Sequence, residues 1–302
     1  MSQQVSPTTG KPYGVKRVCE TGGLARSTYY FHGRERPSDS DKAGTSTRAR
    51  RGPVPAVSDE DLLEAIRVVI TECPFTGEGH RKIWYRLTKV KGLRVARNRV
   101  LRLMREHNLL SPYRVPRGQK QEHEGQITTT EPNVMWGTDG TKVFTAEDGW
   151  TWIFTTMEHW NSECVGFHVC KSGDRKSALQ AVIMAVAEVF GDVRQGIAKD
   201  LQLRSDHGLV YKSEEFQEQV RHWGMTQSFA FVAEPQTNGV VERFNRTLKE
   251  QVIYGRWYRN VKELHDAVAA FVIKYNEQWL VERLGHMSPK NYRRQAAQED
   301  AA

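Results

Sequence analysis

The stretch from 201 to 251 constrains the fold more than any other part of this chain, because it puts two acids on two kinds of element. Apolar and polar residues alternate over 201–205, as on a half-buried strand that ends at Asp206. Apolar residues recur at helical spacing after Asn238-Gly239. They are Val241, Phe244, Leu248 and Val252. We therefore expect Asp206 at a strand end and Glu242 on the exposed side of a helix.

Two cations follow Glu242 on the same predicted helix side. Arg246 and Lys249 lie four and seven residues after it. A carboxylate followed by two cations suits a metal ion beside a polyanion. On an isolated helix, the same pattern is that of an ordinary solvated face with a Glu/Arg pair.

A third acid, Asp139, lies inside the apolar run 134–144, which predicts a central strand. Thirty-five residues separate Asp206 from Glu242. The segments SDHGLVYKSEEF and EPQTNGVVERFNRTLKE resemble the second and third acid motifs of retroviral integrases and bacterial insertion-sequence transposases. The resemblance covers about 136–292. It is strongest to the second-frame product of copy-out, paste-in insertion sequences.

This resemblance implies that Asp139, Asp206 and Glu242 are the three catalytic acids and the metal ligands. The chain departs from the family's usual pattern at Gly140, where a bulky apolar residue often follows the first Asp. It departs again at His207, where a polar residue often follows the second. Both departures leave the acids intact.

The resemblance also implies an α/β fold of the ribonuclease-H-like type, a mixed sheet flanked by helices. The order of predicted elements agrees with it. Strands are expected at 134–144, 150–158, 164–170, up to Asp206 and at 226–232, and helices at 175–190, 213–223, from 239 onward and at 261–278.

Three carboxylates that converge at a sheet edge cannot all stay ionised unless cations neutralise them. Oxygen-only ligands favour Mg²⁺ or Mn²⁺ over zinc, and two ions per active site suit an in-line displacement at phosphorus. Water as the attacking group would free a DNA 3′-hydroxyl. That hydroxyl as the next attacking group would give strand transfer.

The front of the chain carries its positive charge. Residues 1–126 hold 24 Lys/Arg against 13 Asp/Glu, whereas 127–302 hold 20 against 23. A capping box at Ser58 and Asp61 predicts a helix over 59–72. A second helix near His80 with Ile83, Leu87 and Val90 inward, and a third with Val100, Leu103 and Met104, indicate a helix-turn-helix.

Ten Lys/Arg and no Asp/Glu occur from Arg81 to Arg105. A basic solvated face is one interpretation, and DNA binding is the one that explains the missing acids. Arg97 and Asn98 can make bidentate contacts to guanine and adenine, although Asn98 can equally cap a helix. The predicted DNA-binding residues are Arg81, Lys82, Arg97, Asn98, Arg99, Arg246 and Lys249.

Five segments follow from these patterns. They are a partial N-terminal helical DNA-binding segment (1–36), a linker (37–57), the helix-turn-helix domain (58–115), a second linker (116–132) and the catalytic core with its C-terminal helix (133–295). In the resembled family an upstream reading frame supplies further DNA-binding helices. The resemblance therefore implies fusion to such a product.

The predicted function is a DNA transposase that binds the element's terminal repeats and target DNA as double strands, with at least a dimer in the synaptic complex. One alternative is a simple metal-dependent nuclease of the same fold. Another is a DNA-binding regulator or decayed transposase with inert acids. No apolar run reaches the roughly 20 residues of a membrane span, and the first residues lack a signal segment. We expect a cytoplasmic, nucleoid-associated protein.

Overall fold

The computed structural model describes residues 4–32, 55–113, 129–229 and 238–300. They belong to two compact units, one up to Val54 and one from Pro55. The two predicted linkers, and the last three residues of the strand predicted at 226–232, fall wholly or mostly outside the described residues.

The first unit contains two short helices, α1 (Gly14–Thr21) and α2 (Arg26–His32). Gly23, at φ 63°, lies in the turn between them. Among the described residues of this unit, Cys19 is the one buried hydrophobic side chain. With one buried hydrophobic side chain, the described part of this unit does not form a hydrophobic core of its own.

The second unit begins with three helices around their own core: α3 (Asp59–Glu72), α4 (His80–Tyr85) and α5 (Arg97–Glu106). The Ser58 hydroxyl accepts a bond from the Asp61 amide at 3.0 Å and donates to its carboxylate at 2.8 Å, which confirms the predicted cap. The buried residues of this core are Leu62, Ile66, Val69, Ile83, Leu87, Val100, Leu103 and Met104.

The prediction for Val90 is wrong. Its side chain is 68% exposed, although Ile83 and Leu87 of the same predicted face are fully buried. Helix α4 continues as a π-helical turn over Arg86–Val90. A π turn adds a residue to each turn, so it rotates the following side chains off the face that a regular helix would keep.

A five-stranded mixed sheet follows, in the order β3-β2-β1-β4-β5. Antiparallel pairing joins β1 to β2 and β2 to β3, whereas β4 lies parallel to β1 and to β5. The strands are β1 (Met135–Thr145), β2 (Gly149–Glu158), β3 (Cys164–Cys170), β4 (Gln202–Ser205) and β5 (Thr226–Phe229). Among the described strands, β1 is the central one, and β3 and β5 lie at the edges.

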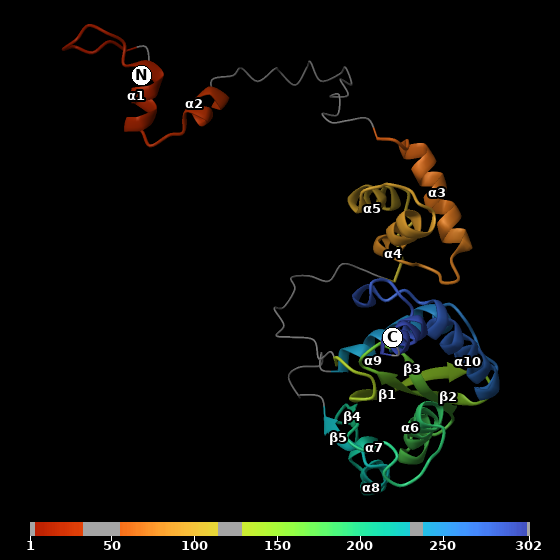
Figure 1. Ribbon diagram of the computed structural model, residues 1–302. Coiled ribbons are helices and arrows are strands. Elements are labelled where there is room, and N and C mark those ends of the chain that lie inside the picture. The colour runs from red at the N-terminus through yellow and green to blue at the C-terminus, as the bar shows by residue number, and fades with distance from the viewer. Residues whose placement is uncertain (1–3, 33–54, 114–128, 230–237, 301–302) are drawn as a thin grey trace. The chain divides into compact units, whose positions relative to one another are not determined.

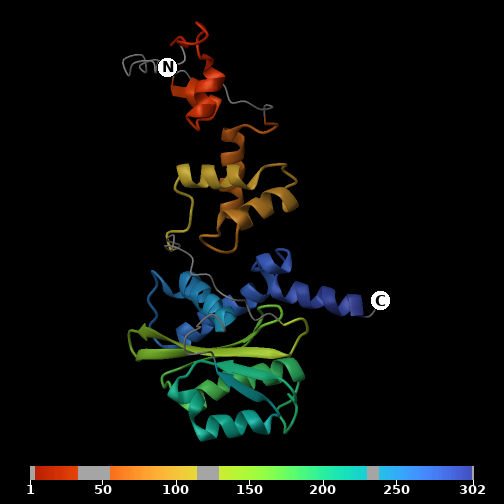
Figure 2. The same ribbon diagram turned by 90° about the vertical axis from the view of Figure 1, so that its left-hand side faces the viewer.

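Helices cover both faces of this sheet (Figure 1; Figure 2). On one face, side chains of α6 and α8 pack with Trp136, Phe154 and Leu203. On the other, side chains of α9 and α10 pack with Ile153 and Met157. The helices of this part are α6 (Arg175–Phe190), α7 (Leu209–Lys212), α8 (Glu214–His222), α9 (Gly239–Leu248), α10 (Val261–Gln278) and α11 (Pro289–Asp300).

This arrangement confirms the predicted ribonuclease-H-like mixed sheet flanked by helices, preceded by a small helical domain. The predicted bounds of β3, α6 and α10 match the structure, and those of β1 and α8 differ by one residue at either end. Among the described helices, none is long and apolar enough to cross a membrane.

Phe75 joins the three-helix part to the helices on the sheet. It is buried in the same cluster as residues of α9 and α10, and its ring meets Trp279 edge to face at 4.9 Å. The backbone of Thr76 pairs with the Gln251 side chain in both directions, at 3.0 and 2.7 Å. A buried aromatic anchor with satisfied polar neighbours is typical of a stable interface.

Candidate active site and nucleic-acid interface

Asp139 lies in the middle of the central strand, where it is partly buried. One carboxylate oxygen accepts the Gly140 amide at 2.8 Å, and the other accepts the Asn245 side-chain amide at 2.9 Å. Burial raises the pKa of this carboxyl to about 6, and the negative charges of Asp206 and Glu242 add to the rise against the two hydrogen bonds. Asp139 therefore interacts electrostatically with both of the other predicted acids.

The register of two parallel strands explains the approach of Asp206. Trp136 pairs with Leu203 and Gly137 with Arg204, so continuing the register by two residues sets Asp139 beside Asp206. Asp206 follows the last residue of β4 and is exposed, and its carboxylate accepts the Gly208 amide at 2.9 Å.

The pKa of Tyr211 is also affected by the negative charges of Asp139 and Asp206. This buried side chain has a pKa well above its usual range, chiefly because of burial and further because Asp139 and Asp206 repel a phenolate. A buried tyrosine beside the two aspartates is therefore held in its neutral form.

Glu242 lies in the first turn of α9 and is exposed, as its place off the apolar stripe predicts. Val241, Phe244 and Leu248 of the same helix are fully buried in the core. The helix approaches β1 closely at Gly137, where a Cβ atom would lie 2.5 Å from a methyl carbon of Val241. The buried stripe thus holds α9 against the strand that carries Asp139.

Asn245 was not among the predicted site residues. It is buried one turn after Glu242, where it donates to Asp139 and accepts a bond from the Thr155 hydroxyl at 3.0 Å. Its position three residues after the glutamate is a signal that the sequence does contain. A search restricted to apolar periodicity and charged residues passes over it.

The three predicted acids do not form a preformed cluster of metal ligands in the described part of the chain. Among the described residues, no three His, Cys, Asp or Glu side chains are arranged as a metal-binding group. The chemistry of the donors nevertheless suits a hard divalent cation, since all are carboxylate oxygens. Burial, and after it the charges of the other two acids, raises the pKa of Asp139, and a bound cation would offset both effects.

The predicted DNA-binding residues fall into two groups in the structure. Arg97 and Asn98 are exposed at the start of α5, and Arg246 is exposed on α9, with Lys249 partly buried just beyond it. The other three pair with groups of the protein itself, Lys82 and Arg99 at partly buried positions and Arg81 at the surface.

These contacts within the protein involve acids and one aromatic ring. The Arg81 guanidinium pairs with Glu282 at 2.8 Å. The Lys82 side chain is 13% exposed, and its ammonium lies 3.7 Å from Glu78 and 2.9 Å from the centroid of the Trp279 ring. Arg99 pairs with Asp59 at 2.6 Å and donates to the Val57 carbonyl at 2.7 Å.

Comparison with known proteins agrees with this architecture. Two family models described as integrase core domain match residues 129–235 and 223–289, and a model described as HTH-like domain matches 58–117. The two integrase models together span β1 to the start of α11.

Among characterised proteins, the transposase for insertion sequence element IS629 of Shigella sonnei is 28% identical over 92% of this chain and 90% of its own length. Transposase InsD for insertion element IS2A/D/F/H/I/K of Escherichia coli is 28% identical over 79% of this chain and 80% of its own.

A similar solved structure is the HTLV-2 integrase catalytic core domain in complex with magnesium, in a trimeric form. Its TM-score is 0.42 at 16% identity, over 54% of this chain and 97% of that one. The two integrase core matches, the HTH-like match and the two transposase relatives all indicate one family. The chain therefore carries an integrase core domain preceded by an HTH-like domain, and it is similar to insertion-sequence transposases.

Proposed function

We propose that this protein is a divalent-metal-dependent DNA transposase that nicks the ends of its insertion sequence and joins them to target DNA. The environment of Asp139 carries the proposal. A partly buried carboxyl at the centre of the sheet, with a pKa raised to about 6 by burial and by two further carboxylates, is poised to bind cations. The names of the transposase relatives support the choice of DNA as the substrate.

Asp139, Asp206 and Glu242 would hold the metal. Two Mg²⁺ or Mn²⁺ ions, when bound by these carboxylates, would activate the attacking oxygen and stabilise the leaving oxygen at phosphorus. Asn245 and the Gly140 amide fix the orientation of the Asp139 carboxylate, since each donates to a different oxygen. Arg246 and Lys249 supply positive charge further along the same helix.

The reaction has two steps, and each step breaks one phosphorus–oxygen bond for the one that it forms. In the first, a water oxygen attacks a phosphorus at the element's end, the bond to the 3′ oxygen breaks, and a 3′-hydroxyl and a 5′-phosphate result. In the second, that 3′ oxygen attacks a target phosphorus and displaces the target's own 3′ oxygen. No side chain forms a covalent bond to DNA.

The three-helix domain would deliver the DNA, with Arg97 and Asn98 at the exposed start of α5 reading bases in the major groove. Two ends must be held together for joining, so the active form would be at least a dimer. An upstream-frame product would add further DNA-binding helices to the first unit. A cytoplasmic, nucleoid-associated location follows from the DNA substrate.

A cleavage assay on labelled end DNA, with Mg²⁺ or with a chelator, tests this proposal. We expect Mg²⁺-dependent nicking and joining by the wild type. Neither should occur in Asp139→Ala, Asp206→Ala or Glu242→Ala, although all three should still bind end DNA. Glu218→Ala, which removes an exposed acid of α8, is the control for charge and should remain active.

The outcomes separate the alternatives. Nicking without joining would identify a simple nuclease. Binding without nicking would identify a regulator or a decayed transposase. Activity within tenfold of wild type in any of the three acid variants would contradict the assignment of the acids.

A further inference from the structure

The structure divides the ten cations between Arg81 and Arg105 into two sets. Six of them pair with acids in the described part of the chain. These six are Arg81, Lys82, Arg86, Lys91, Arg99 and Arg102, whose partners are Glu282, Glu78, Glu72, Asp59 and Glu106. Lys89, Arg94, Arg97 and Arg105 have no such partner among the described residues. The basic run is therefore largely neutralised within the protein, except at these four positions.

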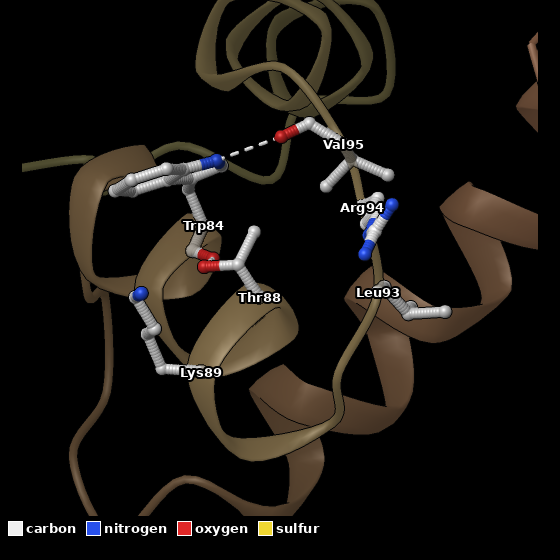
Figure 3. A pocket seen from close by; sticks show the side chains of 6 residues that line it. All are labelled: Trp84, Thr88, Lys89, Leu93, Arg94 and Val95. Atoms are coloured by element: carbon white, nitrogen blue, oxygen red, sulfur yellow. Dashed lines mark hydrogen bonds between the residues drawn. The ribbon is translucent and has the colours of Figure 1, made fainter.

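Three of the four remaining cations lie around one indole ring. Trp84 lines an open hollow of about 480 Å³ together with Lys89 and Arg94, and a second hollow of about 310 Å³ together with Arg97 and Asn98. Figure 3 shows the first hollow, with Lys89 on the helical segment that bears Trp84 and Arg94 on the irregular segment that leads to α5. Both cations are exposed.

The polar groups of the first hollow decide what it can bind. The Trp84 ring nitrogen donates to the Val95 carbonyl at 2.9 Å (Figure 3). The Thr88 hydroxyl donates to the Trp84 carbonyl at 2.9 Å. The remaining donors belong to Lys89 and Arg94, which have no acceptor function. Such a hollow suits an anionic acceptor against an apolar wall, and it has few means to distinguish one base from another.

The second hollow differs in this respect. Asn98 has both donor and acceptor atoms on an exposed amide, and Arg97 has a planar set of donors. Base edges in a major groove present matching donors and acceptors, whereas phosphates present acceptors alone. The two hollows therefore suit different parts of one DNA duplex.

We propose that Lys89 and Arg94, with the Trp84 wall between them, form a site for the sugar-phosphate backbone of duplex DNA. This site orients α5 so that Arg97 and Asn98 meet the base edges. The inference rests on the proposed function, because DNA is the substrate there. It assigns backbone contacts to two residues that sequence reasoning did not single out, and it assigns Arg81, Lys82 and Arg99 to contacts within the protein.

Titrations of the full chain with end DNA and with a shuffled duplex of equal length, over a range of salt, test the site. Each neutralised phosphate contributes about 0.9 to the slope of log affinity against log salt. We expect Lys89→Ala and Arg94→Ala each to lower that slope by about 1 and to weaken both duplexes by the same factor. Lys91→Ala, the matched control two residues after Lys89, removes a cation that already pairs with Glu72 at 2.7 Å and should leave the slope unchanged.

Asn98→Ala provides the contrasting readout. It should reduce the preference for end DNA over shuffled DNA without changing the salt slope. The backbone site would be overturned if both Lys89→Ala and Arg94→Ala kept the wild-type salt slope, or if they lost affinity for end DNA alone. Neither result would contradict the proposed transposase activity. Absence of any DNA binding or end nicking by the wild type would instead reject the proposed function, and the site with it.

Discussion

The Asn245 side-chain amide donates a hydrogen bond of 2.9 Å to the Asp139 carboxylate, and so ties helix α9 to the central strand. Its carbonyl oxygen accepts a bond from Thr155 of the neighbouring strand β2, which fixes the amide's direction. Glu242 lies one turn earlier on the same helix. One amide thus sets the orientation of one predicted catalytic acid relative to another.

Replacing Asn245 with Ala should slow end nicking by about 10–100-fold, the usual cost of losing an orienting partner. The lost hydrogen bond holds the pKa of Asp139 down, so the acid limb of the pH-rate profile should move to higher pH. The measurement is the nicking rate between pH 5 and 9, with Asn291→Ala, an exposed asparagine on α11, as the control. A slower variant with an unmoved profile would leave Asn245 with a purely structural role.

The raised pKa of Asp139 makes folding stability depend on pH. Its value of about 6 in the folded chain, against 3.8 ordinarily, means that the folded state favours the protonated carboxyl. That stabilisation is complete below about pH 4 and is lost as the pH rises through 6. Asp139→Asn should therefore melt about 6–12 °C above wild type at pH 7.5 without divalent cations, and level with it at pH 4.

Mg²⁺ supplies the second arm of the same melting experiment. It should raise the melting temperature of the wild type at pH 7.5 and not that of Asp139→Asn, because the cation relieves a repulsion that the variant lacks. If the difference in melting temperature between the two proteins were the same at every pH and Mg²⁺ concentration, the Asp139 carboxylate would not be destabilised by burial and repulsion in the folded state.

Gly137 sets how closely α9 approaches the strand that carries Asp139. A Cβ atom there would lie 2.5 Å from Val241, 2.8 Å from the Asn238 side-chain oxygen and 2.9 Å from the His159 ring. Gly137→Ala should push the helix outward and reduce nicking at least tenfold, with DNA binding retained. The control is Gly239→Ala at the start of the same helix, where a Cβ atom meets nothing within 4 Å.

Phe75 anchors the three-helix part on the core, and its loss should be costly. Phe75→Ala should lower the free energy of unfolding by about 3–5 kcal/mol, as for other buried aromatic residues. Chemical denaturation followed by tryptophan fluorescence measures this directly, since Trp279 is in contact with the ring. Trp257→Ala, at an 83% exposed position, is the control and should unfold like the wild type.

Lys249 lies seven residues after Glu242, just past the end of α9. If this side of the helix faces DNA, Lys249→Glu should weaken strand transfer strongly, because it replaces an attraction with a repulsion. Lys249→Arg should have little effect, and Lys249→Ala should cost about tenfold, or ~1.4 kcal/mol. Wild-type strand transfer by Lys249→Glu at low salt would mark an ordinary surface lysine.

Local patterns in the sequence were enough to predict the elements with strong periodicity. Helices α6 and α10 and strand β3 have the predicted bounds, since each carries a regular apolar repeat between clear breaks. The same reasoning failed at Val90, because a π-helical turn changes the period. It also passed over Asn245, whose importance lies in partners 106 and 90 residues away in the chain.

Residue type and local spacing were enough to predict the succession of strands and helices and the basic character of the front domain, because these are local properties. The three acids were predicted from the resemblance of their motifs to a known family. Which groups meet depends on the tertiary structure. The parallel register of β1 and β4 aligns Asp139 with Asp206, and the close approach at Gly137 brings α9 alongside them. Ion pairs with acids of distant segments likewise engage cations such as Arg81 and Arg99. Among the described residues, Lys89 and Arg94 have no acid partner, and this difference depends on where the acids lie in the folded chain.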